Sequence, residues 1–205
     1  MSILKVFDDI IGKSLQEKIK SKLMKDFPWF YKDDVSNTVH SHITQSRPAF
    51  NHLFYDNYNE NSDFCWMPNE IVSKVIVELK LKITQIIQSR TFLQLPLSSQ
   101  YLKNDTVDNA HVDSQINHLV FLYYVIDSDG DTIIYDKKWE KGIQHLNSEE
   151  TSKLLIKKRV TPKQGRVVVF DGRYWHTAEQ PKYNKRCVIN TDITYEGINA
   201  DLQIL

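Results

Sequence analysis

Residues 165–176 read Gly-Arg-Val-Val-Val-Phe-Asp-Gly-Arg-Tyr-Trp-His, and this stretch decides the fold class. Its apolar run at 166–170 contains three β-branched valines, as expected of a buried strand, and Asp171-Gly172 ends the run with a turn. Strands are also predicted at 91–97, 118–126, 132–135 and 186–195. Helices first and strands afterwards predict an α+β fold, with helices packed on a sandwich or barrel of short strands.

Two helices are predicted in the first half of the chain. Residues 13–26 place Leu15, Ile19 and Leu23 at helical spacing. A second helix is predicted over about 70–88, opened by Pro68-Asn69-Glu70. Between them, residues 27–64 are rich in Asn, Asp, Ser and aromatic side chains, which predicts loops and short strands.

A chain of 205 residues fits one domain. We therefore expect residues 1–205 to form a single domain, with a helical support region at 1–90 and a core of strands at 91–195. The 26 basic and 26 acidic residues balance, so charge gives no reason to expect binding to nucleic acid or to a membrane surface.

Two cysteines are too few for a disulfide framework. The first residues lack the basic and long apolar regions of a signal peptide, and no stretch approaches the roughly 18 apolar residues of a membrane span. These features predict a cytoplasmic protein that is not inserted in a membrane. They leave the oligomeric state open.

His111-Val112-Asp113 is a candidate pair of metal ligands. In a strand, residues two apart point to the same face, so both side chains could bind one ion while Val112 faces away. A His-x-Asp pair also arises by chance, since the chain has seven histidines.

His176 follows an apolar strand, a turn and two aromatic residues. It is either a core histidine or a third ligand that an antiparallel strand brings beside the first two. Two imidazoles and one carboxylate are the ligand set of non-haem iron(II) oxygenases.

Arg186 begins the alternating stretch 186–195, in which Arg186, Val188, Asn190 and Asp192 share one face. If that face lines the interior, the guanidinium needs an anionic partner, because an unpaired buried charge is costly. The partner is either a carboxylate of the chain or that of a bound ligand.

Together these segments resemble the 2-oxoglutarate- and Fe(II)-dependent oxygenases, in particular the prolyl 4-hydroxylase-like branch. The resemblance covers about 91–195 and includes the order of His111-Val112-Asp113, the strand 120–125, Gly130-Asp131-Thr132, Trp175-His176, Gln180-Pro181 and Arg186. It departs from the family where Gly130-Asp131-Thr132 replaces Gly-Gly-Glu-Thr.

The resemblance implies a double-stranded β-helix (jelly-roll) core. It implies His111, Asp113 and His176 as catalytic ligands of Fe(II), and Arg186 as the partner of the distal carboxylate of 2-oxoglutarate. Tyr124, and by position Tyr101, are implied as further contacts of this co-substrate. O2 would be the oxidant, succinate and CO2 would be released, and ascorbate is a possible reductant.

The first functional expectation is hydroxylation of a peptidyl proline, and the alternative is the same chemistry on a small molecule, a free amino acid or a nucleobase. A zinc hydrolase and a non-catalytic jelly-roll binding module are further alternatives. Substrate is expected to contact Tyr174, Trp175 and Asn190, with residues 27–64 and 137–160 walling the mouth of the barrel. The remaining histidines, which lack such framing, are interpreted as surface or core residues: His40, His42, His52, His118 and His145.

Overall fold

Strand β6 (Leu119–Tyr124) shows how the layers are built, because all six of its side chains are buried. Phe121 and Tyr123 pack into one hydrophobic cluster with the helices, whereas Leu122 and Tyr124 pack into a second cluster. The strand therefore has a packed layer on each face, which explains its unbroken apolar sequence.

The computed structural model describes residues 3–35, 45–103 and 106–196. The other elements, in chain order, are β1 (Leu4–Phe7), α1 (Lys13–Lys25), β2 (Phe30–Lys32), β3 (Ala49–Asp56), β4 (Asn59–Glu60), α2 (Trp66–Glu78), β5 (Lys82–Gln94), β7 (Thr132–Lys138), α3 (Ser148–Ser152), β8 (Ile156–Val160), β9 (Val167–Asp171), β10 (Tyr174–Ala178) and β11 (Arg186–Glu196).

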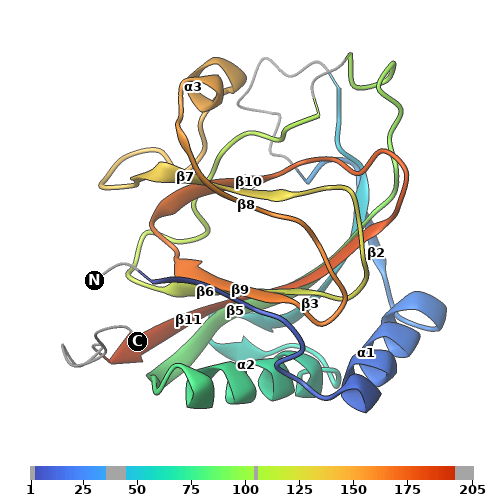
Figure 1. Ribbon diagram of the computed structural model, residues 1–205, viewed down its shortest axis with the longest axis vertical. Coiled ribbons are helices and arrows are strands. Elements are labelled where there is room, and N and C mark those ends of the chain that lie inside the picture. The colour runs from blue at the N-terminus through green and yellow to red at the C-terminus, as the bar shows by residue number, and fades with distance from the viewer. Residues whose placement is uncertain (1–2, 36–44, 104–105, 197–205) are drawn as a thin grey trace.

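Two antiparallel sheets form the core. The larger sheet has eight strands in the order β1-β9-β6-β11-β5-β3-β2, with β4 attached to β3, and the smaller one has the order β10-β7-β8. Helices α1 and α2 lie against the outer face of the larger sheet, and the smaller sheet lies across its inner face (Figure 1). The α+β class and the jelly-roll core predicted from the sequence are confirmed.

Helix α1 is confirmed at the predicted place and buries Ile19 and Leu23. Helix α2 begins at Trp66, four residues before the predicted start, and Pro68 lies in its first turn, where a missing backbone N–H is tolerated. Within the described ranges, no helix is long and apolar enough to cross a membrane.

The prediction of helix over 70–88 is wrong beyond Glu78. Lys80 adopts a left-handed conformation with φ of 51°, and its N–H donates to Val77 O while Leu81 N–H donates to Ile76 O. This pattern is the Schellman motif that closes helices, and glycine is its usual sequence signal. Because a lysine occupies this position, no glycine marks the end of the helix.

Residues 82–88 instead form the first half of β5, which pairs along its length with β11. Ile83, Ile86 and Ile87 are β-branched, as strand residues often are, but their spacing also fits a helix. The residues of β11 that pair with β5 lie about a hundred residues further along the chain. A local sequence pattern therefore could not distinguish a strand from a helix at 82–88.

The description of residues 1–90 as a helical support region is corrected in the same way. Besides the two helices, this part of the chain contributes β1 to β4 and most of β5 to the larger sheet. Strand β1 covers the edge of β9, and β3 pairs with β5. The N-terminal part therefore builds the sheet as well as supporting it.

Candidate active site

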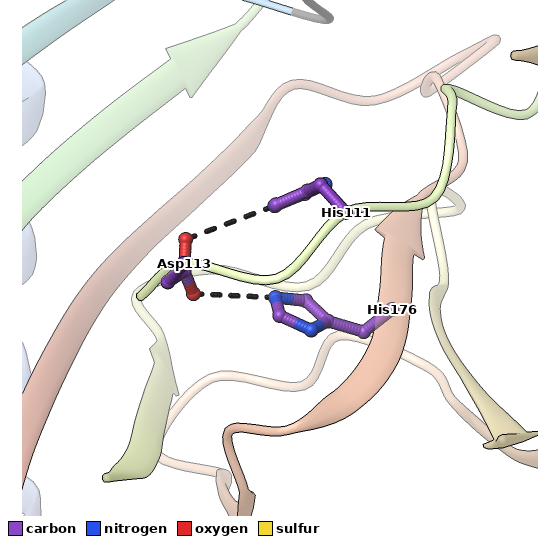
Figure 2. A group of neighbouring side chains, drawn as sticks. All are labelled: His111, Asp113 and His176. Carbon is purple, nitrogen blue, oxygen red and sulfur yellow. Dashed lines mark hydrogen bonds and ion pairs between the residues drawn. The ribbon is translucent and has the colours of Figure 1, made fainter. Parts of the chain in front are cut away.

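Three side chains converge on one point between the sheets. Ligand atoms of His111, Asp113 and His176 all lie within 4.8 Å of one another, a group that could hold a metal ion. His176 Nε2 lies 3.2 Å from Asp113 Oδ2, and His111 Nε2 lies 3.7 Å from Asp113 Oδ1 (Figure 2). The Asp113 side chain is 1 % exposed.

The backbone brings His111 and His176 together as an antiparallel pair. His111 N–H donates to His176 O over 2.9 Å, and His176 N–H donates to His111 O over 3.0 Å. His176 belongs to β10, but His111 forms an isolated bridge rather than part of a strand. The side chains of His111 and Asp113 still point to the same centre, as their spacing predicts.

The second nitrogen of each imidazole faces a backbone carbonyl. His176 Nδ1 lies 2.9 Å from Tyr174 O, and His111 Nδ1 lies 3.4 Å from Asn109 O. A proton on each Nδ1 leaves the Nε2 lone pair available to a metal, which is the arrangement found around metal-binding histidines. The donor set therefore fits a divalent transition metal.

The charge states of His111 and Asp113 also suit a metal. Burial and the neighbouring His176 lower the pKa of His111 to about 3, so its ring is neutral at pH 7. Burial alone would raise the pKa of Asp113, but the adjoining His176 and the charge of Arg90 hold it well below its usual range. Metal ligands must be deprotonated in this way.

The turn Asp171-Gly172-Arg173 sets the start of β10 and hence the position of His176. Asp171 Oδ1 accepts the Arg173 N–H over 3.1 Å, and Oδ2 accepts from Arg173 Nη2 over 2.9 Å and from Lys138 Nζ over 2.6 Å. Burial raises the pKa of Asp171, but these hydrogen bonds outweigh it and lower the pKa to about 2.

We expect Asp171→Asn to lose roughly 2 kcal/mol of unfolding free energy at pH 7. The pKa of Asp171 in the folded state, about 2, is below that of the unfolded chain. Its contribution is therefore complete above about pH 4 and is lost as the pH falls toward 2. Urea unfolding of both proteins from pH 7 to pH 3 measures this. A stability difference that does not shrink on acidification would contradict the assignment.

Arg186 lies at another wall of the site and is 4 % exposed. Its guanidinium donates to Gly130 O over 3.0 Å, to Gln94 Oε1 over 2.8 Å and to Thr132 Oγ1 over 2.9 Å. Within the described residues no carboxylate lies within 4.0 Å of it. A chain carboxylate, one of the two partners considered from the sequence, is thus not found there.

Tyr124 belongs to the same cluster. It is fully buried and donates from its hydroxyl to Thr132 Oγ1 over 2.8 Å. Because Thr132 accepts from both Tyr124 and Arg186, its own hydroxyl hydrogen remains for a further acceptor. Gly130 is needed beside Arg186, since a Cβ there would lie 2.5 Å from Glu179 O.

A cavity of about 300 Å³ connects the triad to Arg186. Its apolar wall includes Phe92, Leu122, Phe170 and Val188. Of the predicted substrate residues, Asn190 lines this cavity and donates to Asp113 Oδ2 over 3.2 Å.

Four predicted contact residues do not line the cavity. Tyr124 contacts Thr132, which does line it. Tyr101 is 42 % exposed, and its hydroxyl lies 3.1 Å from Ser46 Oγ. Tyr174 and Trp175 are buried in separate hydrophobic clusters on either side of β10. Trp175 is adjacent to His176 and therefore points to the opposite face of β10. Tyr174 lies two residues before His176, and the pairing of β10 with β7 is irregular between these two residues.

Residues that the sequence analysis missed line the same cavity. Arg90 Nη2 lies 2.6 Å from Asp113 Oδ1, and Gln94 binds Arg186. His145, interpreted from the sequence as a surface or core histidine, stacks on His111 with ring centroids 5.9 Å apart. His52 and His118 are buried as expected, and His40 and His42 lie outside the described residues.

The predicted walls of the mouth do contribute. Val35 comes from the segment 27–64, and Gln144 and His145 come from 137–160.

Asp108 and Arg47 form a buried ion pair beside the cavity. Arg47 Nε donates to Asp108 Oδ1 over 3.0 Å, and Gln180 Nε2 donates to both carboxylate oxygens. We expect Asp108→Ala to lower the free energy of unfolding by about 3–5 kcal/mol, because it breaks a buried pair. Urea denaturation measures this.

The matched control is Glu196→Ala, which breaks the exposed Lys82–Glu196 pair. An exposed pair contributes only about 0–1 kcal/mol. Equal losses in the two variants would contradict a structural role for the Asp108 pair.

No protein-family model matches this sequence, and no curated protein matches it. Solved structures do. A prolyl hydroxylase from Trichoplax adhaerens, in complex with a hypoxia inducible factor oxygen degradation domain peptide, is 14 % identical, with 93 % of this chain and 83 % of that chain covered and a TM-score of 0.58. An oxidoreductase of the 2OG-Fe(II) oxygenase family from Burkholderia pseudomallei is 10 % identical, covering 94 % and 84 %, with a TM-score of 0.61.

HygX from Streptomyces hygroscopicus, with nickel, 2-oxoglutarate and hygromycin B bound, is 11 % identical, covering 94 % and 83 %, with a TM-score of 0.58. The chain thus has the fold of the 2-oxoglutarate- and Fe(II)-dependent oxygenases, and the resemblance seen in the sequence is confirmed at the level of the fold.

Proposed function

We propose that this chain is an Fe(II)- and 2-oxoglutarate-dependent oxygenase that hydroxylates a C–H bond, with residues 1–205 acting as one domain. The observation that carries the proposal is the cavity itself. It joins two histidines and a carboxylate that could hold a metal to a buried arginine without a carboxylate partner among the described residues. Neither a zinc hydrolase nor a binding module requires that combination.

In this proposal His111, Asp113 and His176 would hold Fe(II). Bound Fe(II) and 2-oxoglutarate would supply the oxidation of the C–H bond by O2, with release of succinate and CO2. The protein orients the reactants, and the low pKa of His111 keeps that imidazole unprotonated.

Arg186 holds the distal carboxylate of 2-oxoglutarate. Three of its five N–H groups bind Gly130, Gln94 and Thr132, which fixes the guanidinium plane and leaves two for a ligand. The Thr132 hydroxyl offers a further donor, and Tyr124 supports the carboxylate site through Thr132. The apolar wall strengthens the ion pair by excluding water.

We propose a peptidyl proline as the first substrate to test. A prolyl hydroxylase bound to a peptide shares this fold, and Asn190 at the cavity wall could contact the substrate. The alternative is a small molecule, since HygX with hygromycin B bound shares the fold equally well.

Succinate release tests the proposal. Protein with Fe(II), 2-oxoglutarate and O2 should release succinate, whereas the zinc-loaded protein should not. A panel of proline peptides and of small molecules then tests the substrate, because the true substrate should accelerate the release. No succinate with any member of the panel, under conditions where Fe(II) and 2-oxoglutarate both bind, would contradict an oxygenase.

A further inference from the structure

Arg90 is a charged residue of the cavity wall that the proposed chemistry has not yet used. It belongs to β5 and pairs across the sheet with Asn190 of β11. Its side chain is 26 % exposed, and its guanidinium lies 5.4 Å from the centre of the Phe92 ring. Phe92 therefore supports one face of the guanidinium while its edge reaches Asp113.

The two oxygens of Asp113 have different partners. Oδ1 accepts from Arg90 Nη2 over 2.6 Å, a short charge-assisted hydrogen bond. Oδ2 lies 3.2 Å from His176 Nε2 and 3.2 Å from Asn190 Nδ2. The carboxylate is thus held at both oxygens by β5 and β11, while Oδ2 faces the nearest imidazole.

We propose that Arg90 is a positioning residue of the metal site, which binds Asp113 Oδ1 so that the carboxylate offers Oδ2 to the metal. This inference rests on the proposed function. Asp113 follows an isolated bridge rather than a strand, so its backbone alone fixes its side chain poorly. Arg90 supplies that constraint from the larger sheet.

A second buried carboxylate strengthens the argument. Asp192 is 2 % exposed, and its Oδ1 has no hydrogen-bond partner among the described residues. Burial and the charge of Asp113 raise the pKa of Asp192, and the charge of Arg90 opposes this. The charge of Arg90 therefore acts on both acidic side chains, and its removal takes away the hydrogen bond to Asp113 Oδ1.

Removal of Arg90 could change metal affinity in either direction, so the direction of the change tests the proposal. A guanidinium and a metal ion are both positive and share one carboxylate. If repulsion outweighed orientation, removing Arg90 would tighten metal binding. If orientation dominates, as proposed, removal weakens it.

The test is a titration of the protein with Co(II), without 2-oxoglutarate, followed by calorimetry and by visible absorption. Arg90→Met should weaken Co(II) binding about 10- to 100-fold, the usual effect of losing a group that orients a ligand. Arg90→Lys keeps the charge but lacks the planar guanidinium. Its Co(II) affinity should lie between that of Arg90→Met and that of the unsubstituted protein. Arg90→Gln fills similar space and keeps the test available if the methionine variant does not fold.

Arg166→Met is the matched control. Arg166 is 23 % exposed and binds Asp8 through Nε and Nη2, so the control also breaks an Arg–Asp pair, but away from the cavity. Its Co(II) affinity should equal that of the unsubstituted protein.

Unchanged or tighter Co(II) binding by Arg90→Met or Arg90→Gln overturns this inference while leaving the proposed function intact. Equal Co(II) binding by the unsubstituted protein and by His176→Ala instead overturns the metal site itself. The two failures are therefore distinguishable.

Discussion

Arg186→Met is expected to weaken 2-oxoglutarate binding by about 30-fold to several thousand-fold. Removing one partner of a buried, hydrogen-bonded charge pair costs about 2–5 kcal/mol. Arg186 is buried, and Gly130, Gln94 and Thr132 fix its guanidinium in place. Calorimetric titration of the Mn(II)-loaded protein with 2-oxoglutarate measures the loss without turnover.

Arg186→Lys separates charge from geometry, because lysine keeps the charge but cannot bind a carboxylate in the bidentate manner. It should retain part of the affinity. Arg166→Met, which removes an arginine away from the cavity, should bind 2-oxoglutarate as the unsubstituted protein does. Equal affinity in Arg186→Met would show that the co-substrate binds elsewhere.

His176→Ala is expected to have the other large effect, on the metal. Removal of one of three ligands should reduce Mn(II) affinity by more than the roughly 10–100-fold that follows loss of a group that merely orients a ligand. Asp113→Ala should behave likewise, since its carboxylate lies beside both imidazoles. Mn(II) titration monitored by electron paramagnetic resonance measures the change.

His52→Ala serves as the control for a buried histidine. His52 is 7 % exposed, contacts Pro28 O and Ser62 Oγ, and does not line the cavity. Its substitution should leave Mn(II) affinity unchanged. If His52→Ala lost the metal to the same extent, the loss in His176→Ala would reflect folding rather than ligation.

The central residues of the site were predictable because they depend on local rules. Alternation along β11 turns Arg186, Val188 and Asn190 inward. The two-residue spacing of His111 and Asp113 puts both side chains on one side, although His111 forms only an isolated bridge. The strands themselves were marked by β-branched runs.

Arg90 and the extent of β5 depend on pairing with β11, which lies about a hundred residues further along the chain. Arg90 also falls between the predicted helix and the predicted strand, so no pattern singled it out. The end of α2 was hidden because Lys80 adopts a conformation that glycine usually signals.

Tyr174 and Trp175 were expected to contact substrate because they are close in sequence to His176, but neither lines the cavity. Both side chains pack into hydrophobic clusters instead. Tyr101 was predicted to contact the co-substrate because it lies ten residues before His111. Its hydroxyl instead lies 3.1 Å from Ser46 Oγ.

The most direct test of the account is the visible spectrum of the protein with Fe(II) and 2-oxoglutarate in the absence of O2. Binding of both at one centre should produce the weak charge-transfer band of the Fe(II)–keto-acid chelate. We expect the band in the unsubstituted protein, its loss in His176→Ala, and a much higher 2-oxoglutarate requirement in Arg186→Met. No band in the unsubstituted protein, or the same band in all three proteins, would contradict the account.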